Sequence, residues 1–146
     1  MPNITAELVN KAYEALDSGN MEQIKKYWAE DMNWLTPGHH QLSGWYHGRD
    51  AFLAFMSNVA KLSANSFHME RSAIMTSDEY SADVSHNVGY RAGSEGKGEV
   101  PYQRLDINVV HVLRWRNSQV IEGRGAIFGD GTTQFDQFWS PIGDRK

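Results

Sequence analysis

Two histidines, on stretches that the sequence predicts to be neighbouring strands, are the residues best suited to catalysis. Residues 82–90 alternate between polar and apolar side chains, and His86 lies in the apolar, even-numbered row. Residues 105–115 alternate in the same way, and His111 lies in the apolar, odd-numbered row. Because alternate side chains of a strand face the same side of a sheet, both imidazoles are predicted to lie on the inner faces of two strands that a hairpin would pair.

An imidazole gains or loses a proton near neutral pH, so it can serve as both acid and base. His86 and His111 could therefore pass a proton onto and off one substrate. The alternative is a pair of core histidines that donate hydrogen bonds to backbone carbonyls. The residues by themselves leave both interpretations open.

A third candidate for proton transfer is Asp130, which lies between Gly129 and Gly131 at the end of a predicted strand. A carboxylate in this place could orient a histidine or act as a base at the mouth of a cavity. Asp-Gly is also a common turn sequence, so an ordinary turn residue is the competing interpretation.

The segment 34–56 is rich in aromatic residues for a stretch that begins as a loop around a Pro-Gly pair. It contains two of the five tryptophans and three of the six histidines. Aromatic rings can stack on a planar ligand, and we predict that Trp34, His40 and Tyr46 shape the substrate. The alternative is that this segment is a buried plug.

One arginine is predicted to contact the substrate. Arg124, on the predicted fourth strand, could neutralise a substrate carboxylate or enolate. It could instead pair with Glu122 or Asp136, which would make it an ordinary surface residue.

Neither a metal site nor a cofactor is expected. The histidines are numerous, but no pair shows the helical i, i+4 spacing with a carboxylate that marks many metal sites. The chain has no cysteine, which excludes disulfides, thiol nucleophiles and thiolate metal ligands.

Charge and hydropathy exclude several classes of partner. The net charge of −4 leaves no basic stripe for a nucleic acid backbone. No apolar run approaches the ~18 residues of a membrane span, and the N-terminus lacks the charged and then apolar pattern of a signal peptide. We expect one cytoplasmic domain over residues 1–146 that binds neither nucleic acid nor membrane.

Helical periodicity is confined to the first part of the chain. Apolar residues at spacings of three and four predict helices over 5–18, 21–29 and 50–62, with Thr5 and Asp50 as N-caps.

Strand periodicity follows. Period-two patterns predict strands over 66–75, 80–91, 102–116, 119–128 and 133–139. Asn117-Ser118 fits a two-residue hairpin turn. Helices first and antiparallel strands afterwards predict an α+β fold, in which a curved sheet wraps three N-terminal helices.

Three local signatures carry a family resemblance. They are Trp34-x-x-Pro37-Gly38 followed by Leu42-Ser43-Gly44-x-Tyr46-x-Gly48-Arg49-Asp50-Ala51, the hairpin from Val112-Leu113 to Val120-Ile121-Glu122, and Asp130 with Phe135-Asp136-x-Phe138-Trp139. Together with the N-terminal helices they resemble the SnoaL-like branch of the nuclear transport factor 2-like superfamily. The resemblance implies a cone-shaped half-barrel around one deep pocket, and a homodimer.

Members of that superfamily suggest roles for particular residues. Scytalone dehydratase uses two strand histidines inside its pocket, and His86 and His111 resemble that pair. SnoaL-type cyclases use acid and base side chains at the ends of the pocket, and Asp130 is the best match. Asp130 also resembles one aspartate of limonene epoxide hydrolase.

Ketosteroid isomerase resembles this chain less completely. Its general-base aspartate corresponds to Thr36, which is not basic, and its oxyanion acid falls near Asn108 or Asp106. The resemblance adds Asn108 to the candidate substrate-binding residues.

The sequence thus predicts a cofactor-independent enzyme of natural-product or small-molecule metabolism. It would cyclise, isomerise or dehydrate an apolar polyketide-like or polycyclic substrate, with His86, His111 and Asp130 as catalytic residues. The alternatives are a non-catalytic ligand-binding domain of the same fold, an epoxide hydrolase, and a structural subunit with a filled cone. A homodimer through the outer face of the sheet is expected.

Overall fold

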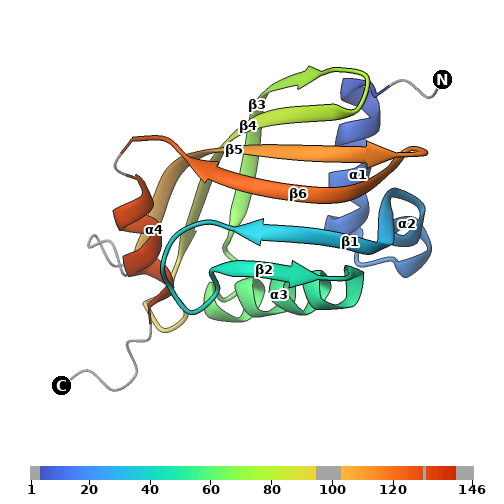
Figure 1. Cartoon of the computed structure of the whole chain (residues 1–146). Helices are drawn as coiled ribbons and strands as arrows, with labels where there is room; N and C mark the ends of the chain where they lie inside the picture. Colours follow the sequence, from blue (N-terminus) through green and yellow to red (C-terminus); the bar gives the residue numbers. More distant parts are fainter. Residues whose placement is uncertain (1–3, 95–102, 130, 141–146) are drawn as a thin grey trace.

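A curled, open sheet of six strands and four helices make up the part of the chain that the computed structural model describes, residues 4–94, 103–129 and 131–140 (Figure 1). The elements are α1 (Ala6–Ser18), α2 (Met21–Tyr27), β1 (Trp28–Thr36), β2 (Gly44–His47), α3 (Arg49–Leu62), β3 (His68–Thr76), β4 (Tyr80–Tyr90), β5 (Arg104–Arg116), β6 (Gln119–Ile127) and α4 (Gly131–Trp139). The strands lie in the order β2-β1-β6-β5-β4-β3, and only β1 and β6 are parallel neighbours. The predicted α+β fold with a curved, mostly antiparallel sheet is confirmed.

The ends of α1 follow the local sequence. Thr5 Oγ1 accepts a hydrogen bond from the Leu8 backbone N–H at 3.1 Å, as expected of an N-cap. Gly19 ends the helix with a φ of 68°, in the left-handed region that glycine adopts without steric penalty. Asn20 then caps α2 by accepting from the Glu22 backbone N–H. The two N-terminal helices are therefore set by their caps.

The start of α3 differs from the prediction. Gly48, with a φ of 93°, is its N-cap and offers no side chain, whereas Asp50 lies in the first turn. Asp50 as an N-cap is wrong. A carboxylate in the first turn still interacts favourably with the positive end of the helix dipole.

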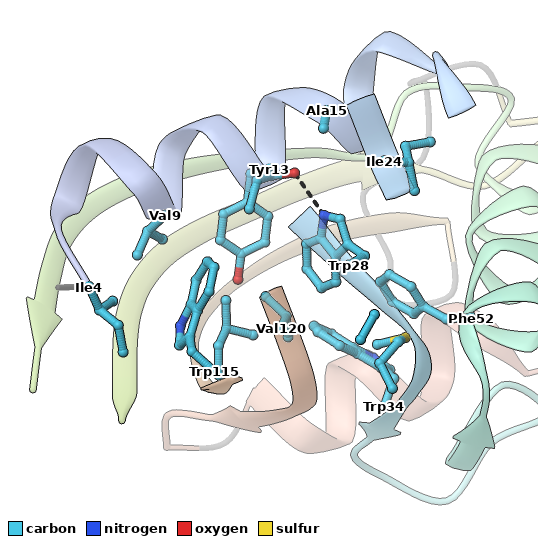
Figure 2. Close-up of a cluster of buried hydrophobic side chains, with 14 residues drawn as sticks. Ile4, Val9, Tyr13, Ala15, Ile24, Trp28, Trp34, Phe52, Trp115 and Val120 are labelled. Atoms are coloured by element: carbon cyan, nitrogen blue, oxygen red, sulfur yellow. Dashed lines mark hydrogen bonds between the residues drawn. The ribbon is translucent and has the colours of Figure 1, made fainter. Parts of the chain in front are cut away.

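An aromatic cluster fixes β1 against α1 and α3. Figure 2 shows Trp28, Trp34 and Phe52 packed together, and the ring centroid of Phe52 lies 5.2 Å from Trp28 and 4.8 Å from Trp34. The Trp28 indole N–H donates to the Ala12 carbonyl at 2.9 Å, which ties β1 to α1. Burial of each large side chain contributes about 1.5–3 kcal/mol, so this cluster is a rigid support for the residues next to it.

Two strands were missed at the N-terminal side. The sequence predicts a helix to residue 29 and then a loop, but α2 ends at Tyr27, and β1 and β2 follow. The register of β1 against β6 shifts between Trp28 and Asn33. A bulge of this kind interrupts period-two alternation, which is why the pattern did not reveal the strand.

The predicted strand over 133–139 is wrong, because this segment is the helix α4. Phe135, Phe138 and Trp139 are spaced as i, i+3 and i+4, so they share one helical face, and all three are buried. The Arg91 guanidinium donates to the carbonyls of Phe138 and Ser140, each at 2.7 Å, and so satisfies the C-terminal end of α4.

The inner face of the sheet is predicted correctly for β5 and wrongly for β4. On β5 the odd-numbered row, with His111, is buried. On β4 the buried row is the polar one, with Asp83, Ser85 and Asn87, and the apolar row with His86 faces outward. The polar row can be buried because its members have hydrogen-bond partners inside the fold.

The hairpin between β5 and β6 forms as predicted. Asn117 and Ser118 have φ values of 52° and 64°. Positive φ at both central residues is the geometry of a type I′ turn, which matches the twist of paired strands.

Candidate active site

A cavity of about 430 Å³ lies between the inner face of the sheet and helices α1, α3 and α4. Its wall is mainly apolar and aromatic, and includes Phe52, Phe55, Met56, Val59, Phe135 and Trp139. Its lining residues Asp17, Asn65 and His68 are exposed, so the cavity opens between the end of α1 and the start of β3. A volume of this size with an apolar wall is typical of small-molecule sites.

His111 is the titratable group at the centre of the cavity wall. Its Nδ1 lies 3.3 Å from Oδ1 of Asp83, which is the only hydrogen bond of its side chain within the described residues. The ring lies beside two aromatic neighbours, with centroid distances of 5.6 Å to Trp34 and 6.3 Å to Tyr13. The imidazole is therefore held on three sides and can meet a ligand through Nε2.

Asp83 is fully buried behind His111. The Tyr13 hydroxyl donates to Asp83 Oδ2 at 2.8 Å, while Oδ1 faces the imidazole. Burial, and next the adjacent carboxylate, raise the pKa of Tyr13 well above 10, so the hydroxyl keeps its proton. Tyr13, Asp83 and His111 form one hydrogen-bonded chain that ends at the cavity.

This chain of three residues can orient a general base. A carboxylate only accepts hydrogen bonds, so it favours the imidazole tautomer with the proton on Nδ1. Nε2 is then the basic nitrogen of a ring that lines the cavity, and the carboxylate stabilises the imidazolium that forms when Nε2 takes a proton.

Tyr13 and Asp83 were missed as functional residues. Tyr13 lies within the predicted helix 5–18, and Asp83 lies in the odd-numbered row of 82–90, opposite the row predicted to face inward. The sequence did contain one signal, the polar row of Asp83, Ser85 and Asn87 on one strand face. If such a row is buried, its side chains need hydrogen-bond partners inside the fold. The partner of Asp83, Tyr13 in α1, is 70 residues away along the chain.

Two buried polar atoms belong to residues of the cavity wall near the end of β1. Thr36 is 4% exposed, and its Oγ1 is buried without a hydrogen-bond partner in the described part of the chain. His40 Nε2 is buried without a described partner as well, and both residues line the cavity. Burial lowers the pKa of His40 from 6.5 to about 4, so its imidazole is neutral at pH 7.

Three of the predicted site residues therefore lie in the cavity wall: Trp34, His40 and His111. Trp34 packs closely over Gly123, where an added Cβ would lie 2.3 Å from the indole. Asp130 lies outside the described residues.

The predicted inward position of His86 is wrong. Its side chain is 46% exposed on the outer face of the sheet, where Nε2 lies 2.5 Å from Asp106. Asn108 is the register partner of His86 on β5 and is exposed on the same outer face, so its predicted substrate contact is wrong too.

Arg124 and Tyr46 are also corrected. Arg124 is exposed and its Nε lies 3.3 Å from Glu122, the pairing that was its alternative. Tyr46 is absent from the cavity lining. Its hydroxyl donates to the Leu42 carbonyl at 2.6 Å and its ring packs on Phe55, so it supports the wall from behind.

Two properties of the described residues bear on partners. They contain no cluster of three His, Asp or Glu side chains arranged to hold a metal ion. Within the same ranges, no helix has the length and apolarity to cross a membrane.

The SnoaL-like domain family matches residues 9–123, which is most of the chain. The chain belongs to the SnoaL-like family. No curated protein sequence matches this SnoaL-like protein.

Solved structures agree with the family. Bal32a, from a soil-derived mobile gene cassette, is 27% identical, with a TM-score of 0.78 over 92% of this chain and 95% of that chain. An NTF2-like protein of unknown function from Burkholderia pseudomallei is 19% identical, with a TM-score of 0.72 over 92% and 96%. TerC, co-crystallised with polyporic acid, is 13% identical, with a TM-score of 0.70 over 92% and 97%. The SnoaL-like protein thus has the NTF2-like fold that its sequence resembles.

Proposed function

We propose that this SnoaL-like protein is a cofactor-independent enzyme that moves a proton on an apolar polyketide-like or polycyclic small molecule. The observation that carries the proposal is His111, whose Nδ1 is held by the buried Asp83 and whose ring lines an apolar cavity of about 430 Å³. Cyclisation, isomerisation and dehydration all include such a proton transfer, so each is compatible with this site.

In the proposed reaction, His111 Nε2 removes a proton from a carbon or hydroxyl of the substrate and returns it at another atom. Asp83 stabilises the intermediate imidazolium, and the Tyr13 hydroxyl keeps Asp83 in place. A positioned general acid or base contributes typically about 10²–10⁴-fold to a reaction rate. His86 has no part in this reaction, because it lies on the opposite face of the sheet.

The apolar wall supplies the remaining contribution. Trp34, Phe52 and Phe135 can hold a planar substrate in one conformation, and holding reacting atoms in place lowers the barrier further. The similarity to TerC, which was co-crystallised with polyporic acid, supports a small-molecule ligand for this cavity.

A homodimer through the outer face of the sheet and a cytoplasmic location complete the proposal. Sedimentation at several protein concentrations measures the oligomeric state. A monomer at all concentrations would contradict the dimer.

The experiment uses a ketone whose α-protons are readily exchanged, 2-tetralone, in D₂O. Proton NMR follows the loss of the α-proton signals with the wild type, His111→Ala and His111→Gln. The matched control is His86→Ala, a histidine outside the cavity. We expect wild type and His86→Ala to accelerate exchange equally, and both His111 variants to lose at least a hundredfold.

Two results would contradict the proposal. Equal exchange rates for wild type and the folded His111 variants would remove His111 from the reaction. Thermal stabilisation by 2-tetralone or polyporic acid without any exchange would instead identify a non-catalytic binding domain.

A further inference from the structure

We propose that Arg71 anchors a carboxylate of the ligand in the cavity, with the Asn87 amide as a neighbouring hydrogen-bond donor. The ligand is then an apolar acid, and its acid group sets its orientation. The inference rests on the proposed function for the presence of a small-molecule ligand in this cavity. It does not depend on the role of His111.

Arg71 is the only arginine or lysine among the described residues that line the cavity. It pairs with Ser85 across β3 and β4, and the Ser85 side chain is buried on the inner face of the sheet. Residues that are directly opposite each other on paired strands have side chains on the same face, so Arg71 extends inward from β3. A guanidinium stays charged at any physiological pH. Arg71 is therefore a permanent positive charge in a mainly apolar wall.

Two contacts with α1 hold the Arg71 guanidinium in place. Its central carbon lies 4.3 Å from the centroid of the Tyr13 ring, and its Nε donates to Asn10 Oδ1 at 3.3 Å. An aromatic face is a favourable surface for a guanidinium. These contacts occupy Nε and one face of the group, so the two terminal nitrogens remain for other partners. A cation oriented in this way loses little freedom when a ligand binds.

Arg71 has no carboxylate partner among the described residues. Asp83 does not serve, because its two oxygens face Tyr13 and His111. Neither terminal nitrogen of Arg71 has a described hydrogen-bond partner, and neither is enclosed by the protein. Four other arginines do pair with a carboxylate, namely Arg104, Arg114, Arg116 and Arg124. The donors of Arg71 are thus available to an anion.

Asn87 supplies further donors to the cavity. Its side chain lines the cavity although the residue is only 3% exposed. The Ser85 hydroxyl donates to Asn87 Oδ1 at 2.7 Å, and the amide NH₂ has no partner in the described part of the chain. This NH₂ is not enclosed by protein atoms, so it opens to the cavity. Because buried polar groups in native proteins nearly always have a partner, this amide indicates a ligand with an accepting group.

The sheet register makes Arg71 and Asn87 diagonal neighbours. Arg71 pairs with Ser85, and Met69, two residues earlier on β3, pairs with Asn87. Diagonal neighbours on antiparallel strands are about 7–8 Å apart, a separation that long side chains can span. The guanidinium and the amide therefore border one region of the wall, where β3 and β4 face α1.

A carboxylate suits these donors better than other anions do. It can accept two parallel hydrogen bonds from the terminal nitrogens of an arginine, and its remaining lone pairs can accept from an amide NH₂. Its single negative charge balances one guanidinium. A phosphate monoester carries a charge of about −1.5 to −2 at pH 7, and Asp17, which also lines the cavity, would repel the excess. An uncompensated charge is strongly unfavourable against an apolar wall.

The anchor lies apart from the predicted base, with Tyr13 beside both. The guanidinium carbon is 4.3 Å from the centroid of the Tyr13 ring, and the His111 ring centroid is 6.3 Å from the same point. Since Arg71 and His111 line one cavity, one molecule can place its acid group at Arg71 and another atom at His111. An anchored acid group would thus restrict which atom of the substrate meets the base.

The experiment compares 2-naphthoate with 2-naphthamide at pH 7, because the two share a planar ring system and differ in charge. Calorimetry gives dissociation constants for wild type, Arg71→Met, Arg71→Lys and Asn87→Leu. The matched control is Arg114→Met, since Arg114 also stacks on a tyrosine but is exposed on the outer face of the sheet. Both methionine variants change the net charge equally.

We expect wild type and Arg114→Met to bind 2-naphthoate at least fivefold more tightly than 2-naphthamide. Arg71→Met should weaken 2-naphthoate at least tenfold and leave 2-naphthamide within threefold, because only the anion loses a charged hydrogen bond. Arg71→Lys keeps the charge but not the planar fork, so its affinity for 2-naphthoate should lie between the two. Asn87→Leu, a side chain of similar size without donors, should weaken 2-naphthoate at least threefold.

NMR of protein labelled with ¹⁵N-arginine gives a second measurement, which does not depend on relative affinities. One Nε resonance should move when 2-naphthoate binds and stay in place with 2-naphthamide, and that resonance should be missing from Arg71→Lys. A melting curve for each variant shows whether it is folded.

The outcomes separate this inference from the proposed function. Equal affinities for acid and amide in the wild type, or failure of 2-naphthoate to bind, would overturn the subsite. So would an equal loss of both ligands in folded Arg71→Met, because Arg71 would then only support Tyr13 and α1. If His111 variants keep full exchange of 2-tetralone while the preference for the acid still depends on Arg71, the proposed function fails and the carboxylate subsite stands.

Discussion

Replacing Asp83 by asparagine should abolish most of the proton transfer while leaving the fold intact. The amide has the same shape as the carboxylate, so both hydrogen bonds of Asp83 can persist. The Tyr13 hydroxyl donates to Oδ2 in the wild type, so the arrangement that keeps this bond turns the amide oxygen toward Tyr13. The amide NH₂ then faces His111 Nδ1 and donates to it. This forces the imidazole proton onto Nε2 and removes the basic lone pair from the cavity.

The size of the loss follows from the interactions removed. The imidazolium loses a hydrogen bond to a charged partner, about 1.5–3 kcal/mol, and restoring the reactive tautomer breaks a neutral bond of about 0.5–1.5 kcal/mol. The sum is about 2–4.5 kcal/mol. At about 1.36 kcal/mol for each factor of ten, exchange should slow about 30- to 2,000-fold.

The assay is the exchange of 2-tetralone α-protons in D₂O, with near-UV circular dichroism and a melting curve for each protein. Asp106→Asn is the matched control, because Asp106 pairs with His86 outside the cavity. It should exchange at the wild-type rate. If a folded Asp83→Asn variant stays within threefold of wild type, or Asp106→Asn falls equally, the reasoning about the Asp83–His111 pair is refuted.

Three further changes test the packing and electrostatics of the site. Tyr13→Phe removes one hydrogen-bond donor from the fully buried Asp83 carboxylate. The free energy of unfolding, measured in urea, should fall by about 1.5–3 kcal/mol. An unchanged value would mean that the Tyr13–Asp83 bond is not formed. The pKa of His40 is lowered in the fold by burial, so its neutral form stabilises the protein above pH 6.5. That contribution, at most about 3 kcal/mol, is lost as the pH falls toward 4. The difference in unfolding free energy between wild type and His40→Gln should therefore shrink over this range, and a constant difference would contradict the buried neutral imidazole. Gly123→Ala places a Cβ 2.3 Å from the Trp34 indole and should destabilise the protein by about 1–3 kcal/mol on the same urea measurement, whereas wild-type stability would show that the indole can move aside.

The elements with clean periodicity could be predicted from the sequence. α1 has both a cap and an apolar stripe, and the alternation along β5 placed His111 correctly on the inner face. The turn at Asn117-Ser118 could also be predicted, because few residue pairs suit positive φ. These features depend on residues close together in the chain.

The features that depend on distant partners could not be predicted. β4 turns a polar row inward because Tyr13, on α1, satisfies Asp83. Local hydrophobic alternation points the other way, so His86 was assigned to the wrong face. Asn108 and Arg124 were assigned to the substrate for a related reason. Asn108 was chosen from a family resemblance and Arg124 from its charge, and neither property shows which face of its strand the side chain occupies.

β1 illustrates a third limit. A parallel neighbour in the sheet and a register shift near its start hide its alternation, although its inward residues Trp34 and Thr36 form part of the cavity wall. Thr36 Oγ1 and His40 Nε2 are buried without partners among the described residues, which only a three-dimensional arrangement can reveal.

The tautomer of His111 is the most direct test of the central claim. In protein labelled with ¹⁵N-histidine, NMR of the neutral imidazole measures which ring nitrogen carries the proton. We expect a protonated Nδ1 and an unprotonated Nε2 whose resonance moves when 2-tetralone binds. A proton on Nε2, or a ring nitrogen that does not respond to the ligand, would contradict a base directed into the cavity.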